Sequence, residues 1–250
     1  DRSCDGTSNT LDTVAIQIGA GRGTGILNPI YLCTRSQFQE IETSSENLTK
    51  DYQLKQDINV GPFDGKNIGT PVNQFEGSLN GDFYTLYGAE ITPSGSGGDE
   101  GIFGHIGNTG SVFNLKLAAN KIEAGSAGSA NNLGTLAGVN NGSISNIILM
   151  GGKVHGFNGT GGLVGTNNGL IENIWGGVEV LADNDIVGGI VGVNNGSMKN
   201  IHSYSSPMFN NSALVVLGGV VGNNTGSIDR ADFKGYLSYN TLANYTHGAV

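Results

Sequence analysis

The chain has 250 residues, of which 43 are glycine, and its formal net charge is −9. Charged residues make up only 13% of it and form no Lys/Arg run, which disfavours nucleic acid and anionic membrane surfaces as partners. Hydrophobic residues reach 37%, so a core is possible, but no run of about 18 apolar residues could insert into a membrane. The composition is typical of turn-dense β structure and not of a disordered chain.

Residues 1–50 are expected to form an N-terminal arm and cap with the first strand. The two cysteines, Cys4 and Cys33, match neither a metal motif nor Cys-x-x-Cys redox spacing. We interpret them as one disulfide that fixes the arm to the first strand, and the alternative is two buried free thiols. A disulfide would indicate a secreted or periplasmic protein.

The cap is also expected to contain the one short helix of the chain. The pattern over residues 34–41 predicts a helix with Thr34 or Ser36 as its N-cap and with Phe38 and Ile41 on one face. Such a cap would protect the open end of a β fold from pairing with other chains.

Residues 51–100 follow a looser pattern, which we interpret as degenerate early coils of the same fold. Alternating apolar and polar residues predict strands at 52–58 and 83–87, and residues 75–81 read as a strand entering an Asn-Gly turn. Residues 92–100 are rich in glycine and serine. We interpret this stretch as an excursion from the coil and not as a domain linker.

From residue 101 to residue 250 the sequence repeats. A glycine follows an apolar pair at positions 104, 138, 165, 192 and 222, at intervals of 34, 27, 27 and 30 residues. This period indicates a solenoid, because one unit can bury its apolar face only against stacked neighbours. Four of these glycines are expected where the coil bends or where backbones approach closely. They are Gly138, Gly165, Gly192 and Gly222.

The pattern inside each unit predicts strands and tight turns. Asn-Asn-Gly triplets at 140–142, 167–169 and 194–196 are turn signals. The strand that follows each turn alternates, and its apolar residues recur in register. These residues are Ile144, Ile171, Met198 and Ile228. A unit of about 27 residues suits three short strands and three turns, so we predict an all-β parallel β-helix forming one continuous domain.

Asparagine also recurs at one register position. Asn114, Asn146, Asn173 and Asn200 share it, and arginine replaces asparagine in the last unit. Equivalent residues of successive coils would stack about 4.8 Å apart. Each side-chain amide could then bond the amide or the turn backbone of the next coil. We interpret these residues as a structural ladder and not as a ligand-binding site.

The last residues resemble the opening of another unit. His247 and Gly248 follow Gly219 at the repeat interval, so the chain is expected to stop in mid-repeat. We therefore expect this sequence to be part of a longer protein.

No catalytic, metal-binding or cofactor-binding residues are expected. The four histidines form no zinc motif, and the glycine-rich residues 19–25 lack the Gly-Lys-Ser/Thr ending of a phosphate-binding loop. The charged residues that align across successive coils support one alternative, a glycan-processing β-helix enzyme. They are Glu172, Lys199, Asp229 and Arg230. Solubilising cross-strand pairs explain them more simply.

Residues 163–173 and 190–200 resemble the GLUG repeat of bacterial surface proteins. Upstream, residues 28–32 with 36–41, then 52–59 and 75–81, resemble the segments that precede such repeats, so the resemblance covers roughly residues 26–250. Repeats of this type occur in large secreted adhesins, in filamentous-haemagglutinin-like proteins and outside the catalytic domain of IgA-cleaving metallopeptidases. The resemblance implies a right-handed β-helix that serves as a stalk or display scaffold.

The expected function is that of a non-catalytic, extracellular β-helix in a microbial adhesin or surface-structural protein. Its expected partners are a host or neighbouring-cell surface glycan or protein, or further copies in a surface assembly. Binding is expected on segments that break the repeat, namely residues 92–100 and 203–211. Tyr204, Met208 and Phe209 in the second segment suit a contact patch, and the alternative is burial against the coil.

Overall fold

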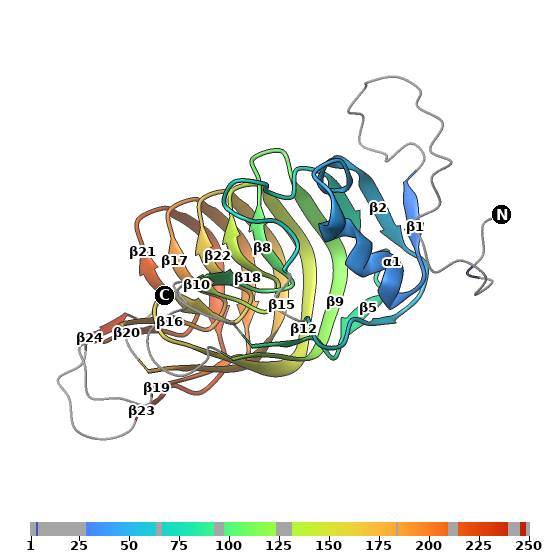
Figure 1. The fold of residues 1–250 in the computed structure, drawn as a ribbon. Helices are drawn as coiled ribbons and strands as arrows, with labels where there is room; N and C mark the ends of the chain where they lie inside the picture. Colours follow the sequence, from blue (N-terminus) through green and yellow to red (C-terminus); the bar gives the residue numbers. More distant parts are fainter. Residues whose placement is uncertain are drawn as a thin grey trace.

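The computed structural model is a β-solenoid whose coils stack along one axis (Figure 1). It describes Cys4 and residues 29–63, 67–92, 98–123, 132–183, 185–209, 215–239 and 246–248. Every pairing between the described strands is parallel. The predicted all-β parallel coil with one short helix near its N-terminus is therefore confirmed.

The smallest sheet has five strands, one from each of five successive coils. They are β8 (Phe103–Ile106), β11 (Ala137–Asn140), β14 (Val164–Asn167), β17 (Val191–Asn194) and β21 (Val221–Asn224). The second sheet has six strands. They are β7 (Asp99–Glu100), β10 (Asn132–Leu133), β13 (Thr160–Gly161), β16 (Asp185–Gly188), β20 (Val215–Gly218) and β24 (Thr246–Gly248).

The largest sheet has thirteen strands and contains the three longest strands of the described chain. The long strands are β9 (Ser111–Glu123), β12 (Ser143–Gly156) and β15 (Leu170–Ala182). The later coils contribute β18 (Ser197–Ser203), β19 (Ser206–Phe209), β22 (Ser227–Phe233) and β23 (Ser238–Tyr239). The early coils contribute β1 (Ile30–Leu32), β2 (Asp51–Leu54), β3 (Ile58–Asn59), β4 (Ser78–Asn80), β5 (Thr85–Tyr87) and β6 (Glu90–Ile91).

A left-handed residue interrupts each principal strand of the large sheet near its start. The φ angle there is 54° at Asn114, 56° at Asn146 and at Asn173, and 61° at Asn200 and at Arg230. Asparagine tolerates this conformation better than other residues with a β-carbon, because its short polar side chain bonds locally. The left-handed backbone conformation therefore explains why asparagine recurs at this position. The long strands curve around the coil (Figure 1).

The core consists of aliphatic ladders that run along the solenoid. Ile144, Ile171, Met198 and Ile228 align in consecutive strands, as the alternation predicts. The first three are at most 1% exposed, whereas Ile228 in the last coil is partly buried. Burying each such side chain contributes about 1.5–3 kcal/mol, so stability depends on neighbouring coils.

The repeated glycines lie where the five-stranded sheet approaches the preceding coil, at or next to a strand of the six-stranded sheet. A β-carbon at Gly165 would lie 2.5 Å from the backbone nitrogen of Leu133. One at Gly138 or Gly192 would lie 2.5 or 2.6 Å from a backbone carbon. At Gly222 the nearest atom, at 2.5 Å, belongs to a side chain instead. A side chain at these positions would push the sheets apart.

The cap contains helix α1 (Arg35–Gln39), which continues as a short 3-10 helix over Glu40–Thr43. Thr34 is the N-cap and forms a capping box with Gln37, which fixes the start of the helix. Phe38 and Ile41 are fully buried, as the periodicity predicts. No helix in the described ranges is long and apolar enough to cross a membrane.

Several strands begin or end elsewhere than the sequence predicts. The strand expected at 83–87 begins at Thr85, because Asp82 and Phe83 adopt positive φ angles in a turn. The strand expected at 52–58 divides into β2 and β3. In the last coil, Gly248 pairs with Gly218 and not with Gly219.

Candidate functional site

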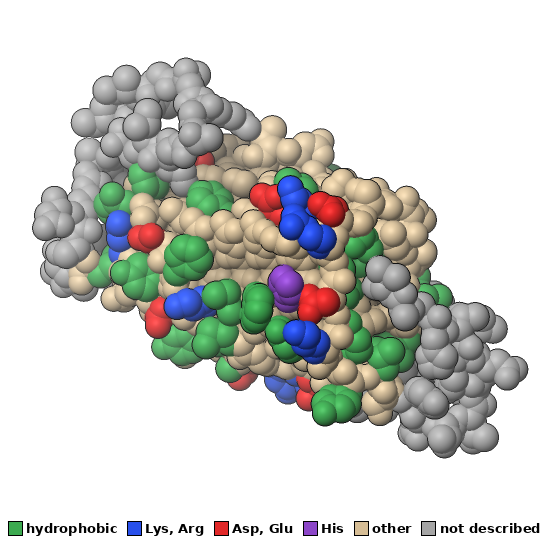
Figure 2. All heavy atoms as spheres, turned by 180° about the vertical axis from the view of Figure 1, so that it is seen from behind, with side chains coloured by type: hydrophobic (Ala, Val, Ile, Leu, Met, Phe, Trp, Pro, Cys, Tyr) green, Lys and Arg blue, Asp and Glu red, His purple; other side chains and the backbone are tan. Residues whose placement is uncertain are grey.

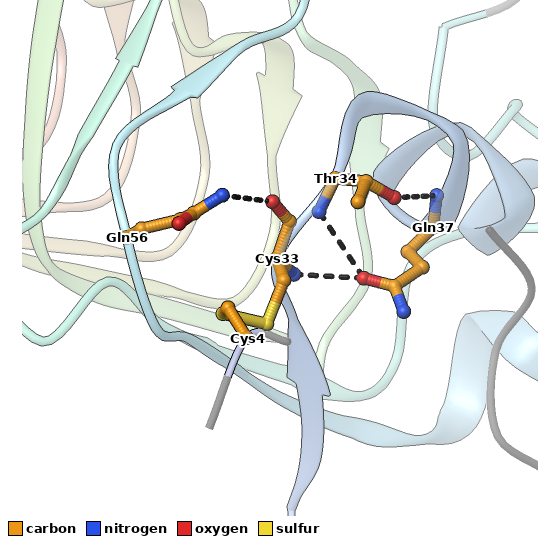
Figure 3. Close-up of a disulfide and its surroundings, with 5 residues drawn as sticks. All are labelled: Cys4, Cys33, Thr34, Gln37 and Gln56. Atoms are coloured by element: carbon orange, nitrogen blue, oxygen red, sulfur yellow. Dashed lines mark hydrogen bonds between the residues drawn. A yellow bond between two sulfur atoms is a disulfide. The ribbon is translucent and has the colours of Figure 1, made fainter. Parts of the chain in front are cut away.

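The cap is covalently joined to the N-terminal arm, because Cys4 and Cys33 form a disulfide with a Cα–Cα distance of 5.5 Å. The Cys33 backbone nitrogen donates to Oε1 of Gln37 at 2.8 Å, and Gln56 donates to the Cys33 carbonyl at 2.5 Å (Figure 3). These bonds hold Cys33 between the helix and the first coils. The disulfide indicates folding in an oxidising environment.

The predicted asparagine positions form a continuous ladder of side-chain amides. Asn146 donates to Asn114 at 2.9 Å, Asn173 to Asn146 at 3.0 Å, and Asn200 to Asn173 at 2.9 Å. Each bond joins two coils, so these amides serve the fold. The ladder starts one coil earlier than predicted, because Asn114 donates to Asn80 at 3.3 Å.

Two more ladders arise from the Asn-Asn-Gly turns, and the sequence analysis did not identify them. Asn140 donates to Asn167, and Asn167 donates to Asn194, both at 2.8 Å, and all three are fully buried. Asn194 continues to Asn224 at 2.7 Å. The second ladder is exposed and links Asn141, Asn168, Asn195 and Thr225. The equal 27-residue spacing of the triplets is the sequence signal for both.

The outer face of the large sheet carries side chains that these ladders do not use. Trp175, His202 and Asp232 align in β15, β18 and β22. They point outward because Ile174 and Ile201, their inward neighbours, are fully buried. The alternation that builds the core therefore also places a row of larger polar and aromatic side chains on the surface.

Trp175 is the centre of an aromatic patch on this face. It is 52% exposed, and its ring centroid lies 4.8 Å from that of His202 and 5.7 Å from that of Tyr204. Tyr204 is 38% exposed, and Met150, one coil before Trp175, is 55% exposed. Figure 2 shows this face, where hydrophobic side chains gather beside a histidine.

Charged groups border the aromatic patch on the side of the last coil. His202 Nδ1 contacts Asp232 Oδ1, and Asp232 Oδ2 lies 3.7 Å from the Lys234 ammonium. The same ammonium lies 6.0 Å from the centroid of the Tyr204 ring. Hydrogen-bonding groups of both charges therefore adjoin the exposed rings.

We define the aromatic patch by six residues. They are Met150, Trp175, His202, Tyr204, Asp232 and Lys234. Of the predicted binding residues, Tyr204 belongs to it. Residues 203–209 do not form the expected excursion, because Ser206–Phe209 is a strand that pairs with β15, and residues 210 and 211 lie outside the described part of the structure. The side chains of Met208 and Phe209 lie outside the described part of the structure, as do residues 93–97 and the glycine-rich residues 19–25.

The charged row expected on the outer face is present. Glu172, Lys199 and Asp229 align in successive strands, and the Arg230 Nε lies 3.9 Å from Asp229. Arg230 and Asp229 are both about two-thirds exposed at 66% and 68%. Such exposed pairs contribute little to stability, and the row has the geometry of solubilising cross-strand pairs.

A second group of titratable side chains lies where β7 and β8 meet. His105 Nε2 lies 2.8 Å from Asp99 Oδ2, and Asn132 donates to the other oxygen at 2.6 Å. Burial alone would raise the pKa of Asp99, but the hydrogen bonds from His105 and Asn132 outweigh it and leave the pKa below its ordinary value. Burial raises the pKa of the adjacent Glu100. Across the described residues, no three His, Cys, Asp or Glu side chains are grouped to hold a metal ion.

Comparison with known proteins supports the fold. No protein-family model and no curated protein matches the chain. A crystal structure described as a putative immunoglobulin A1 protease from Bacteroides ovatus is similar, with a TM-score of 0.54 and 14% sequence identity. The similarity covers 85% of this chain and 84% of that one. At this identity the likeness shows a shared β-solenoid architecture.

Proposed function

We propose that this chain is a non-catalytic β-solenoid scaffold in a secreted or cell-surface microbial protein of the GLUG-repeat type. The observation that carries the proposal is that the repeated residues bond or pack against their equivalents in neighbouring coils. Three asparagine ladders and the aliphatic ladders join coil to coil, so the repeats hold a rigid rod and leave its outer face free to vary.

The disulfide supports an extracellular location. In this proposal the scaffold presents exposed side chains to a surface glycan or protein, as an adhesin segment does. The titratable group around Asp99 is the place where a glycan-processing activity would be sought, because a carboxylate with a lowered pKa lies beside a carboxyl group with a raised one.

An attachment assay tests the proposal. Beads that carry the whole chain, coupled through one terminus, should adhere to bacterial and epithelial cell surfaces above the level of beads carrying a protein of the same net charge. A reducing-sugar assay with the same protein should show no turnover of polysaccharides. Adhesion at the control level, or sustained turnover that Asp99→Asn abolishes, would contradict the proposed function.

A further inference from the structure

We propose that the aromatic patch binds a neutral glycan made of pyranose units. This inference rests on the proposed function and names the site and the ligand class through which the scaffold would attach. Trp175 is 52% exposed on a rigid sheet, so its indole forgoes the burial that such a large side chain normally gains.

The arrangement of the rings suits a sugar. An aromatic face is electron-rich and attracts the slightly positive C–H groups on the flat side of a pyranose. Trp175 is inclined at 40° to His202 and to Tyr204, so the rings form a bent platform and not one flat surface. Successive coils are about 4.8 Å apart, which is comparable to the length that one pyranose adds to a glycan chain.

The polar border supplies the hydrogen bonds that sugar hydroxyl groups require. Asp232 and Lys234 sit beside the rings and offer carboxylate acceptors and ammonium donors. Asp232 also contacts His202, which holds the carboxylate at the edge of the platform. Groups that accept and groups that donate are therefore both within reach of a sugar stacked on Trp175.

Charge favours a neutral glycan over an acidic one. The one acidic and one basic residue of the patch offset each other, as do Glu172, Asp229, Lys199 and Arg230 in the neighbouring row. The chain as a whole carries a charge of −9, which repels a polyanion.

The size of the patch favours a glycan over a protein. A stable protein interface buries about 800 Å² and 20–30 residues on each partner. The large exposed hydrophobic side chains of the patch are Met150, Trp175 and Tyr204. Two charged residues, Asp232 and Lys234, border these side chains. A ligand a few sugar units long matches this extent.

The chain contains a single tryptophan, so fluorescence excited at wavelengths beyond the tyrosine absorption band reports on Trp175 alone. The probes are cellotriose, mannotriose and chitotriose, with a trigalacturonate as the acidic comparison, each titrated to about 10 mM, the range of weak affinities. We expect at least one neutral trisaccharide to shift the emission to shorter wavelength and to protect it from acrylamide. Tyr204→Ala and Asp232→Asn should weaken the affinity for that trisaccharide ~5- to 10-fold.

The matched control is Tyr87→Ala. Tyr87 has the same 38% exposure as Tyr204 and lies on the same sheet, but β9 and β12 separate its strand, β5, from β15, the strand that carries Trp175. This variant should bind the trisaccharide as the wild type does, and the urea midpoint of all three variants should stay close to the wild-type value.

Four outcomes would overturn the inference. They are no response to any neutral trisaccharide, a response to the trigalacturonate alone, equal weakening by Tyr87→Ala, and an emission that shifts with protein concentration because a second copy covers the patch. Bead adhesion that survives Trp175→Ala would refute this site and leave the scaffold function standing. Trisaccharide binding without any bead adhesion would refute the attachment function and leave this site standing.

Discussion

The Asn167 side chain donates to Oδ1 of Asn194 in the next coil at 2.8 Å, and both side chains are completely buried. Asn167 also accepts a hydrogen bond from Asn140 at 2.8 Å. One side chain therefore provides a hydrogen-bond partner for the asparagines of both neighbouring coils. Polar groups this deep in a solenoid are stable only as members of an unbroken chain.

Asn167→Ala should therefore destabilise the fold strongly. The change leaves an amide of Asn140 and an oxygen of Asn194 without their ladder partner, and each unsatisfied buried group costs about 1–3 kcal/mol. The free energy of unfolding, measured in urea, should fall by about 2–5 kcal/mol. The control is Asn168→Ala in the exposed ladder, which should cost under ~1 kcal/mol because water replaces the lost bonds. Equal losses in the two variants would show that burial does not determine how much a ladder contributes to the free energy of unfolding.

Arg230→Asn should stabilise the chain. Arg230 occupies the left-handed position with φ 61°, where arginine is less favourable than asparagine, and its side chain makes only a weak exposed pair with Asp229. Asparagine there could donate to Asn200 and extend the ladder by one coil, a gain of about 0.5–1.5 kcal/mol. Arg230→Ala is the control, and it should give no gain. A gain with alanine would assign the effect to charge and not to the ladder.

Gly165→Ala should cost more than Glu172→Gln, although both change only a few atoms. A β-carbon at residue 165 would lie 2.5 Å from the Leu133 backbone nitrogen, and relieving this contact should cost about 1–3 kcal/mol. Glu172 is on the outer face, and its neutralisation should cost under ~0.5 kcal/mol. The two variants are compared by urea unfolding. A larger loss of stability in Glu172→Gln than in Gly165→Ala would refute the assignment of inner and outer faces.

Asp99→Asn should reduce the loss of stability that the fold undergoes as the pH falls. The pKa of Asp99 is lower in the folded protein than in the unfolded chain, where it is about 3.9. Its contribution to stability is thus complete above the unfolded value and is lost as the pH falls below it. Between about pH 5 and pH 3, the Tm of Asp99→Asn should fall less than that of the wild type.

Glu100→Gln supplies the control of opposite sign for that experiment. The pKa of Glu100 is raised by burial, so ionisation of Glu100 destabilises the fold as the pH rises from about 4.3 through the folded value. Relative to the wild type, Glu100→Gln should therefore have a higher Tm at neutral pH than at acid pH. An unchanged acid response in Asp99→Asn would mean that other carboxyl groups dominate it.

The periodicity of the sequence predicted the coil, its core and one ladder. Spacing of 27 residues with Ile144, Ile171 and Met198 in register is enough to stack strands and to choose the inner face. The same spacing applies to Asn140, Asn167 and Asn194, but their neighbouring glycines indicate a turn, and a local turn signal says nothing about a bond to the next coil. The buried ladder was missed for that reason.

The aromatic patch could not be predicted because its residues do not repeat. Trp175, His202 and Asp232 share a register position, but their chemistry differs from coil to coil, so only the strand pairing shows that they adjoin. Tyr204 was identified by its residue type alone, and the strand at Ser206–Phe209 was mistaken for part of a loop because the repeat interval there lengthens to 30 residues. Register is a long-range property that local pattern does not contain.

The most direct test compares Trp175→Ala with Asn167→Ala in attachment and in unfolding. If inner residues hold the scaffold and the outer patch attaches it, beads carrying Trp175→Ala should lose adhesion while the urea midpoint stays at the wild-type value. Asn167→Ala should show the opposite, a lowered midpoint with adhesion retained at temperatures well below its Tm. Full adhesion by Trp175→Ala, or loss of adhesion by folded Asn167→Ala, would contradict this division between the core and the surface.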